Sequence, residues 1–335
     1  MRWDNLKVEA EEERTLPGYR EPATVRTFDA PEALDTRFYE VRAKSALNKV
    51  PRASRMPFRW TINPYRGCAH ACTFCFARPT HTYLDFDAGR DFEKEIVVKV
   101  NVPEVARAQL MRPSWKREHV ALGTNTDPYQ WVEGRYRLMP GIWEAMRDSR
   151  TPSSVLTKSP LLLRDIELFK QIHEVAGFAA NLSIPTLEEK AWRASEPHTP
   201  HPRKRIEAVA ELNRAGIPTG VLIAPLMPGI NDDPRQVEKI LELCAEAGAV
   251  SIGGIPLHLR GEVRQVFFEW LRSYRPDLVA RYEDLYARGA YVGRAEQERI
   301  RGLVRRGGRS GPPEFDPVTV PERPAGEEPV QTTLF

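Results

Sequence analysis

Three cysteines within eight residues are the part of this sequence best suited to chemistry. Cys68, Cys72 and Cys75 lie in the run Asn63-Pro-Tyr-Arg-Gly-Cys-Ala-His-Ala-Cys-Thr-Phe-Cys-Phe, with the spacing C-x3-C-x2-C. Three thiolates on one short loop can each bind an iron atom of a cubane [4Fe–4S] cluster and leave the fourth iron open. That open iron is a place where a small molecule could bind the cluster and be reduced.

A zinc site is the alternative for this loop. Structural zinc sites usually combine two distant ligand pairs, each at C-x2-C spacing, which a lone triplet does not match. His70 or His81 could still supply a fourth ligand to the three cysteines. The remaining cysteine, Cys244, lies on the apolar face of an expected helix, so we expect it to be a buried small hydrophobe.

The composition is that of a globular chain with a sizeable core. Of 335 residues 41% are hydrophobic, and 49 basic against 46 acidic residues give a formal net charge of +3. Dedicated nucleic-acid-binding domains are usually much more basic than this, so the composition does not indicate one. Clustered thiols in so long a chain favour a reducing compartment over a disulfide framework. We find no secretory leader and no run of eighteen apolar residues, and therefore expect a cytoplasmic protein without a membrane partner.

Short β-rich runs alternate with longer helical patterns from about residue 56 onward. The expected strands are Phe58–Ile62, Ile96–Asn101, His119–Gly123, Ser154–Thr157, Ala179–Ile184, Thr219–Ala224 and Val250–Gly254. The expected helices are residues 103–111, 140–149, 161–175, 202–215, 234–247 and 264–287. This alternation predicts a parallel sheet with right-handed crossovers, either open and doubly wound or closed fully or partly into a barrel. A G-x-G-x-x-G motif is absent after the early strands, so a dinucleotide-binding sheet has no support.

The cysteine motif resembles the signature of the radical S-adenosylmethionine (SAM) superfamily. Cys68-x3-Cys72-x-Phe74-Cys75 matches the pattern CxxxCxΦC, in which Φ is aromatic. More specifically, the chain resembles the spore photoproduct lyase-like branch of that superfamily. Three stretches carry this resemblance: Gly123-Thr-Asn-Thr-Asp-Pro-Tyr-Gln, Glu196-Pro-His-Thr-Pro-His-Pro-Arg-Lys-Arg-Ile and Gly216-Ile-Pro-Thr-Gly-Val-Leu-Ile-Ala-Pro-Leu-Met-Pro-Gly-Ile-Asn-Asp.

The resemblance implies a lyase-like enzyme with a [4Fe–4S] cluster and SAM as cofactors. Cys68, Cys72 and Cys75 would hold the cluster, and the amino and carboxylate groups of SAM would bind its open iron. An electron from a reducing protein of the flavodoxin or ferredoxin type would cleave SAM to methionine and a 5′-deoxyadenosyl radical. The radical would then abstract a hydrogen atom from the substrate, while the protein orients the groups and excludes water.

The fold that this resemblance implies is α/β, a partial (β/α)6-type TIM-like barrel. We expect an N-terminal extension over residues 1–50, the barrel over 51–290, a basic segment over 291–305 and a disordered tail over 306–335. In a parallel barrel the chemistry gathers at the C-terminal ends of the strands. The cysteine loop follows the first expected strand and so lies at that end.

Further cofactor contacts are expected near the ends of the other strands. Lys99 and Asn101 share a strand face, and an inward lysine there would need an anion such as the SAM carboxylate. By resemblance, Phe74 and Phe76 would pack near the adenine, and Ser183, on one strand face with Asn181, near the ribose. The other candidates follow strands or lie on a later connection: Asp127, Lys158, Glu196 and Arg205. For each of them the alternative is a hydrogen bond or ion pair that only shapes the structure.

One segment departs from the branch that the chain resembles. The resemblance implies an additional cysteine that donates a hydrogen atom close to the segment Gly123–Asp127, but this chain has Thr124-Asn-Thr there. The substrate is therefore left open, with a nucleic-acid-related compound as the expectation.

The last residues resemble a bacterial sliding-clamp-binding peptide. The chain ends Gln331-Thr-Thr-Leu-Phe, and Gln331, Leu334 and Phe335 match the fixed positions of that pattern. The resemblance implies a sliding clamp as partner, and the clamp would link the chain to nucleic acid. The alternative function is then a non-enzymatic, DNA-associated adaptor in which the cysteines bind structural zinc.

Overall fold

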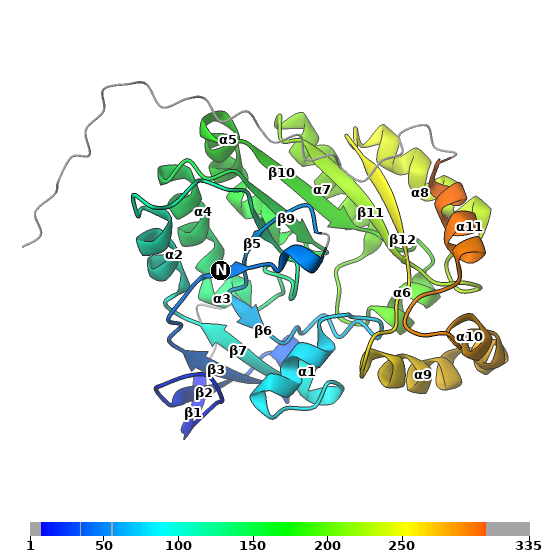
Figure 1. Ribbon diagram of the computed structural model, residues 1–335, viewed down its shortest axis with the longest axis horizontal. Coiled ribbons are helices and arrows are strands. Elements are labelled where there is room, and N and C mark those ends of the chain that lie inside the picture. Colours follow the sequence, from blue (N-terminus) through cyan, green and yellow to red (C-terminus); the bar gives the residue numbers. More distant parts are fainter. Residues whose placement is uncertain (1–7, 34, 55, 306–335) are drawn as a thin grey trace, which may run out of the picture.

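The structure, a computed structural model, describes residues 8–33, 35–54 and 56–305. Two β-sheets and the helices that connect their strands make up this part of the chain (Figure 1). The larger sheet has the strand order β12-β11-β10-β9-β8-β5-β4, and the smaller one has the order β1-β2-β3-β7-β6. The larger sheet carries most of the candidate site.

Six parallel strands form the body of the larger sheet. They are β5 (Trp60–Ile62), β8 (Val120–Leu122), β9 (Ser153–Thr157), β10 (Phe178–Ser183), β11 (Thr219–Leu226) and β12 (Ile252–Pro256). Each of these strands pairs in parallel with the next one in chain order, and the short β4 (Leu47–Lys49) pairs antiparallel with β5. Parallel strands in sequential order form the wall of a partial TIM-like barrel, so the predicted fold class is confirmed.

The connecting helices lie mainly along one face of this sheet (Figure 1). They are α2 (Val102–Leu110), α3 (Glu133–Tyr136), α4 (Leu138–Asp148), α5 (Ile166–Val175), α6 (Glu189–Ser195), α7 (Pro202–Arg214) and α8 (Pro234–Glu246). The 3-10 helix η4 (Pro160–Asp165) precedes α5. The predicted helices 103–111, 140–149, 202–215 and 234–247 therefore agree with α2, α4, α7 and α8 to within two residues at each end.

Helix α8 shows how local sequence sets these elements. The Asp233 carboxylate accepts hydrogen bonds from the backbone N–H groups of Arg235 and Gln236, and Pro234 occupies the first turn, where no N–H group is needed. The apolar stripe of α8, which includes Cys244, is buried against the sheet. Cys244 is fully buried in the apolar core, which confirms its prediction as a small hydrophobe.

The smaller sheet was not predicted from the sequence. Its strands are β1 (Val8–Arg14), β2 (Ala23–Phe28), β3 (Arg37–Val41), β6 (Tyr65–Arg66) and β7 (Glu95–Lys99). The prediction that the run Ile96–Asn101 belongs to the barrel is wrong, because β7 pairs with β3 and β6. All five residues of β7 are buried, and a buried strand with this sequence pattern would be expected in either sheet.

Short helices occur around these strands. They are η1 (Pro31–Ala33), η2 (Arg52–Ser54), η3 (Arg78–Leu84) and α1 (Arg90–Lys94). Helices η3 and α1 follow the cysteine loop and lead into β7. They therefore connect the loop to the smaller sheet.

The end of the described chain is helical. It contains α9 (Val263–Tyr274), η5 (Pro276–Leu278), α10 (Val279–Leu285) and α11 (Arg294–Arg305). The prediction of one helix over 264–287 is wrong, because the helix breaks at Arg275, the residue before Pro276. A proline disfavours helical backbone in the preceding residue, and Arg275 has φ −141° and ψ 71°.

The described residues bury more than one apolar core. The largest lies between the main sheet and its helices and contains no residue of the cysteine loop. A second core lies around α9 and α10 and includes Cys72 and Phe74. The loop is therefore anchored from the side of the C-terminal helices.

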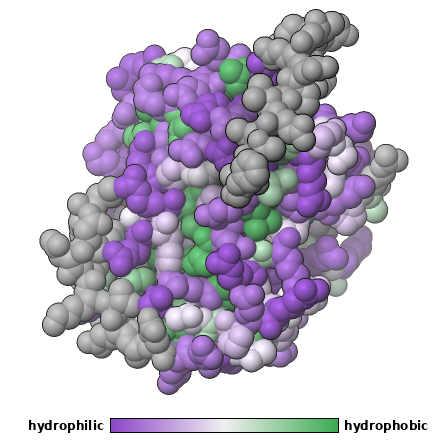
Figure 2. Space-filling view, turned by 90° about the vertical axis from the view of Figure 1, so that its left-hand side faces the viewer, coloured by the Kyte–Doolittle hydropathy of each residue, from purple (hydrophilic) through white to green (hydrophobic). Residues whose placement is uncertain are grey.

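Two predictions concern residues outside the part of the chain described. The tail expected over residues 306–335 and its clamp-binding residues Gln331, Leu334 and Phe335 lie outside the described residues. Among the described helices, none is long and apolar enough to cross a bilayer. Figure 2 shows the side of the molecule at the left of Figure 1, where hydrophilic residues predominate and hydrophobic ones gather near the middle.

Candidate functional site

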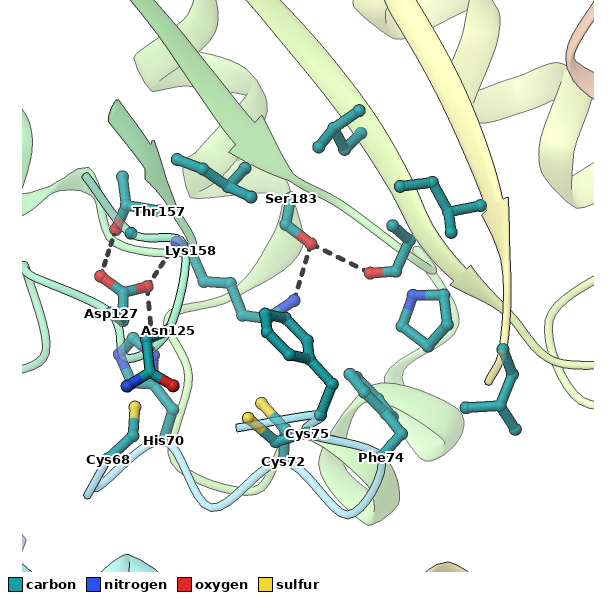
Figure 3. Close-up of a pocket in the computed structure, with 18 of the residues that line it drawn as sticks. Cys68, His70, Cys72, Phe74, Cys75, Asn125, Asp127, Thr157, Lys158 and Ser183 are labelled. Atoms are coloured by element: carbon teal, nitrogen blue, oxygen red, sulfur yellow. Dashed lines mark hydrogen bonds and ion pairs between the residues drawn. The ribbon is translucent and has the colours of Figure 1, made fainter. Parts of the chain in front are cut away.

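A cavity of about 200 Å³ lies at the C-terminal ends of the parallel strands (Figure 3). The cysteine loop forms one wall, and residues at or after β8, β9, β10, β11 and β12 form the others. Its lining consists of Cys68, His70, Cys72, Phe74, Cys75, Phe76, Gly123, Asn125, Asp127, Leu156, Thr157, Lys158, Ser183, Leu222, Ala224, Pro225, Ile255, Pro256, Leu257 and His258. This is the edge of a parallel barrel at which ligands bind.

Backbone hydrogen bonds hold the cysteine loop in place. The N–H group of Cys68 donates to the carbonyl of Phe92 at 2.9 Å, and that of Thr73 donates to the carbonyl of Ser195 at 3.0 Å. The Gln130 side chain accepts from the N–H of Ala69 at 2.9 Å and donates to the carbonyl of Gly67 at 3.2 Å. Segments from three different parts of the chain thus fix the positions of the thiols.

Arg78 is a fully buried support of the loop that sequence reasoning missed. Its guanidinium donates to the backbone carbonyls of Cys72, Ala88 and Gly89 at 3.0, 3.0 and 2.8 Å and pairs with the Glu93 carboxylate. The sequence feature that could have indicated this support is the position of Arg78, three residues after the last cysteine. Its donors close the turn around the cysteines without entering the cavity.

Burial disfavours the charged form of these thiols. It raises the pKa of Cys72 well above the usual thiol value, and it raises the pKa of Cys75 to about 11. Thiols in such a place become thiolates when a metal centre binds them and displaces their protons. The loop therefore suits metal ligation better than nucleophilic catalysis.

The three thiols line one cavity, so each could bind a different iron atom of a cluster there. Among the described residues, no group of three or more His, Cys, Asp or Glu side chains is placed to hold one metal ion. A cubane cluster does not require the three thiolates to converge on one ion, because each thiolate binds a different iron atom. His70 and His81 do not complete a zinc site here, since His70 turns its Nδ1 atom toward Asp127 and His81 does not line the cavity.

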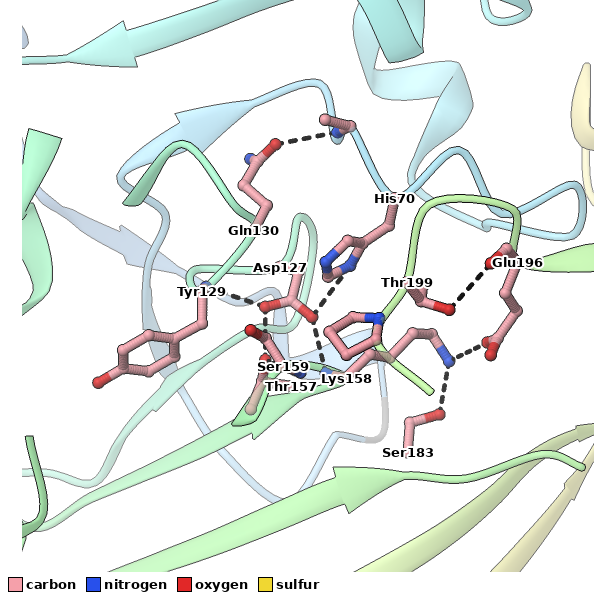
Figure 4. A network of polar contacts seen from close by, with 12 residues as sticks. His70, Asp127, Tyr129, Gln130, Thr157, Lys158, Ser159, Ser183, Glu196 and Thr199 are labelled. Atoms are coloured by element: carbon pink, nitrogen blue, oxygen red, sulfur yellow. Dashed lines mark hydrogen bonds and ion pairs between the residues drawn. The ribbon is translucent and has the colours of Figure 1, made fainter. Parts of the chain in front are cut away.

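Asp127 joins the loop after β8 to the end of β9 and to the cysteine loop (Figure 4). Its carboxylate accepts hydrogen bonds from Thr157 Oγ1 at 2.6 Å and from the N–H groups of Tyr129 and Lys158 at 2.9 and 2.8 Å. His70 Nδ1 lies 3.4 Å from Asp127 Oδ2. Burial raises the pKa of Asp127, but His70 and these donors outweigh burial and lower it. Asp127 lines the cavity and organises its wall, and its role as a cofactor contact stays a prediction.

His70 lies between Asp127 and Cys68. Burial lowers the pKa of His70, but the adjacent Cys68 and Asp127 outweigh burial and raise it to about 10. The ring is 2% exposed and lines the cavity beside Cys68. It therefore forms a polar part of the cavity wall next to Cys68.

Lys158 is the one lysine or arginine among the cavity-lining residues of the described chain. Its Nζ donates to Ser183 Oγ at 2.7 Å, lies 2.6 Å from Glu196 Oε1 and is 5.6 Å from the centroid of the Phe74 ring. Ser183 Oγ in turn donates to the carbonyl of Ala224 at 3.0 Å. The structure thus brings Lys158, Ser183 and Phe74 together at the cavity wall, and their role as cofactor contacts stays a prediction.

Glu196 and Arg205 form a fully buried ion pair behind this wall. Arg205 Nη2 lies 2.9 Å from Glu196 Oε2, and Arg205 Nη1 donates to the carbonyl of Ser183 at 2.8 Å. Burial raises the pKa of Glu196, but Arg205 and Lys158 outweigh burial and lower it. Neither residue lines the cavity, so the pair positions Lys158 and Ser183.

Lys99 and Asn101 are not brought to the cavity. Lys99 Nζ donates to the carbonyl of Asn63 at 2.8 Å, and burial lowers the pKa of Lys99 to about 7. The Asn101 side chain accepts from the N–H of Ala43 at 2.7 Å and donates to its carbonyl at 3.1 Å. Lys99 is the last residue of β7 in the smaller sheet, and Asn101 is the residue before α2, so both contact segments outside the cavity. Asn181 is buried and also lies outside the lining.

The two phenylalanines that flank Cys75 differ in their surroundings. Phe74 is buried at 7% exposure and packs in the second core, whereas Phe76 is 51% exposed at the cavity mouth. Asn125 and His258 also line the cavity and were not predicted as site residues. Both come from loops, where no periodic pattern indicates which way a side chain points.

Comparisons with known proteins agree with this geometry. The family model of the Radical SAM superfamily matches residues 62–253. A Mycobacterium tuberculosis (strain H37Rv) protein named "Uncharacterized protein Rv2578c" is 43% identical over 348 residues and is covered completely, as is this chain. "Uncharacterized protein MJ0683" of Methanocaldococcus jannaschii is 29% identical over 58% of this chain and 69% of its own length.

Solved structures of spore photoproduct lyase have a similar fold. One, in complex with a dinucleoside spore photoproduct, has a TM-score of 0.59 and 14% sequence identity, over 83% of this chain and 82% of that chain. Another, a mutant with bound AdoMet and the dinucleoside photoproduct, has a TM-score of 0.57 and 17% identity, over 80% and 77% of the two chains. With the family match over residues 62–253, these findings establish that the chain belongs to the radical SAM superfamily and is an enzyme of the radical SAM class.

Proposed function

We propose that Cys68, Cys72 and Cys75 hold a [4Fe–4S] cluster and that SAM binds beside it in the cavity. The observation that carries this proposal is that all three thiols line one cavity whose opposite wall holds the single lining lysine, Lys158. When bound, the cluster and SAM would supply one-electron reduction and a carbon-centred radical that takes a hydrogen atom from substrate. The adaptor alternative has no comparable support.

The chain's own residues divide into binding and enclosing groups. Lys158 offers a positive charge to an anionic group such as the SAM carboxylate, and Ser183 offers a hydroxyl to a ribose. Phe74 gives an apolar ring surface next to Lys158. The apolar side chains of the remaining wall keep water from the reacting atoms: Leu156, Leu222, Ala224, Pro225 and Leu257.

For the substrate we propose a nucleic-acid-related compound. The solved relatives of similar fold are described as complexes with a dinucleoside photoproduct. This chain differs in having Thr124-Asn-Thr in the segment where the resemblance implies a hydrogen-donating cysteine, and Asn125 lines the cavity. We therefore propose a different reaction on a related substrate, with electrons from a small protein of the flavodoxin or ferredoxin type.

Anaerobic reconstitution with iron and sulfide tests the cofactor assignment. We expect about four irons per chain and, with dithionite and SAM, formation of 5′-deoxyadenosine. The triple variant Cys68→Ala, Cys72→Ala, Cys75→Ala should lose both. Cys244→Ala is the matched control, because Cys244 is a buried cysteine outside the cavity. Unchanged iron content and SAM cleavage in the triple variant would refute the proposal.

A further inference from the structure

Three rings form a row at the mouth of the cavity. The centroids of Phe76 and His258 are 6.0 Å apart, and those of His258 and Tyr291 are 5.7 Å apart with an interplanar angle of 22°. Phe76 is 51% exposed and Tyr291 is 61% exposed, while Phe76 and His258 also line the cavity. We call this row the aromatic rim. Single exposed rings are common, but a contiguous row of them at a cavity mouth is typical of a ligand-binding surface.

Backbone contacts hold the aromatic rim in position. His258 and Tyr291 face each other across an antiparallel β-bridge, and the N–H group of Leu259 donates to the carbonyl of Ala290 at 2.8 Å. The buried Tyr286 hydroxyl donates to the carbonyl of Leu257 at 2.7 Å. Two segments, residues 257–264 and 286–294, are thereby joined into one unit, so the rings are preorganised.

The same two segments carry exposed positive charge. They contain four arginines and one acidic residue, Glu262. Arg264 is engaged with the backbone carbonyl of Tyr286 at 2.9 Å. The other three arginines, Arg260, Arg288 and Arg294, are exposed. Burial and, to a smaller extent, the positive charge of the nearby Arg260 lower the pKa of His258. The surroundings of the rim therefore favour an anionic ligand.

We propose that the aromatic rim stacks an unpaired base of a single-stranded nucleic acid and that Arg260, Arg288 and Arg294 contact the flanking phosphates. Flat rings stack on bases of any sequence, and guanidinium groups bind phosphates by charge-assisted hydrogen bonds. The row leads into the cavity, so a base held there has its reactive edge next to the proposed radical site. A base must leave its duplex to be reached in this way. The inference rests on the proposed function for its catalytic meaning, but not for binding itself.

Fluorescence anisotropy with a labelled single-stranded oligothymidylate and the full chain tests the arginine contacts. The triple variant Arg260→Gln, Arg288→Gln, Arg294→Gln should bind at least 10-fold more weakly. The slope of log affinity against log salt concentration should become less negative by about 2 in this variant. Each lost phosphate contact to a single strand changes that slope by about 0.7. Arg112→Gln, Arg150→Gln, Arg214→Gln is the control, because these exposed arginines precede β8, β9 and β11 at the opposite end of the strands.

Tyr291 tests stacking. Tyr291→Leu should weaken the binding of the single strand by about 5- to 100-fold. Tyr291→Phe, which keeps the ring, should bind the single strand like the parent. The inference is overturned if the rim and control triple variants bind alike, if Leu and Phe at position 291 behave alike, or if a duplex or an acidic peptide binds as tightly as the single strand. Binding is measured without SAM or reductant. If the protein binds the single strand as expected but does not cleave SAM, the proposed function is refuted, whereas the proposed role of the aromatic rim in binding is not.

Discussion

Individual side chains at this site have separate tasks that their partners reveal. Asp127 and the pair Glu196–Arg205 are saturated by contacts within the chain, so they position their neighbours. Lys158 and Ser183 also have partners within the chain, but unlike Glu196 and Arg205 they line the cavity. The candidate site is therefore a small set of ligand-facing groups on a buried polar support.

Lys158→Met should weaken the binding of SAM to the reconstituted protein by about 10- to 100-fold. The substitution removes the charge of the lining lysine but keeps most of its length, and a hydrogen bond to a charged group contributes about 1.5–3 kcal/mol. Isothermal titration calorimetry measures the change. Lys170→Met, on the exposed side of α5, should bind SAM like the parent. Equal affinities for the two variants would exclude Lys158 from the SAM site.

Glu196→Gln should lower the free energy of unfolding by about 3–5 kcal/mol at pH 7. The change leaves Arg205 buried without its anionic partner. Because Arg205 and Lys158 hold the pKa of Glu196 below its usual value, the stabilisation is present above the ordinary glutamate pKa of about 4.3 and is lost as the pH falls through the lower folded value.

Urea unfolding of parent and Glu196→Gln at several pH values from 7 downward checks this. The difference between the two proteins should narrow with falling pH, since only the parent has a carboxylate to protonate there. Glu207→Gln, which removes an exposed partner of Lys204, should change stability by about 0.5 kcal/mol or less at every pH. If the difference in unfolding free energy between the parent and Glu196→Gln does not change with pH, the assigned ion pair is contradicted.

At the level of elements, the strand ends set the geometry of the cavity. Gly123, directly after β8, has φ +78°, and a Cβ atom there would lie 1.8 Å from the carbonyl oxygen of Leu156 on β9. A glycine is required because the backbone is left-handed and because the neighbouring strand is so close. This close approach places Asp127 within reach of the end of β9.

Gly123→Ala should therefore destabilise the protein by more than about 3 kcal/mol, from left-handed backbone strain and from overpacking against β9. Gly216→Ala separates the two causes. Gly216 has φ +83°, but a Cβ atom there would meet nothing within 4 Å. Only the backbone strain of about 1–2 kcal/mol should remain for that variant. Chemical denaturation gives both values, and equal losses would show that the contact with Leu156 is relieved at little cost.

The barrel elements could be predicted because period and stop signals are local. Helix α8 has its cap, its proline and its apolar stripe within thirteen residues, and Asp127 and Lys158 were found because they follow strands. Pairing of β7 with β3 could not be predicted, since a fully buried strand with an apolar centre fits either sheet. Lys99 and Asn101 were misplaced with it. Arg78, in the short helix η3, and Gln130 and His258, in irregular segments, were missed because no sequence periodicity shows where such side chains point.

At the scale of the whole molecule, α11 covers the end of the barrel wall. Ile300 and Val304 are buried, and Val304 packs where a side chain at Gly254 of β12 would clash, 2.4 Å from its Cγ2 atom. In the described part of the chain, β12 is the last strand of its sheet. An uncovered edge strand is prone to pair with other chains, so α11 protects the sheet as well as completing its core.

Val304→Asp should destabilise the protein by about 3–5 kcal/mol, because it buries an unpaired carboxylate against β12. We also expect concentration-dependent association, since the edge becomes accessible. Thermal unfolding and size-exclusion chromatography measure the two effects. Arg301→Gln, on the exposed side of the same helix, should change stability by about 0.5 kcal/mol or less. A stable, monomeric Val304→Asp protein would show that α11 is dispensable for the barrel.

The bridge between His258 and Tyr291 lies beyond the part of the chain that matches the superfamily model. The proposed cluster and SAM contacts lie within residues 62–253, as does Phe76 of the aromatic rim, whereas His258, Tyr291 and the three arginines follow that range. Radical generation and target choice would then be inherited separately. A chimera that exchanges residues 257–305 with the 43% identical mycobacterial relative would keep its cofactor chemistry and take on the donor's preference for a target.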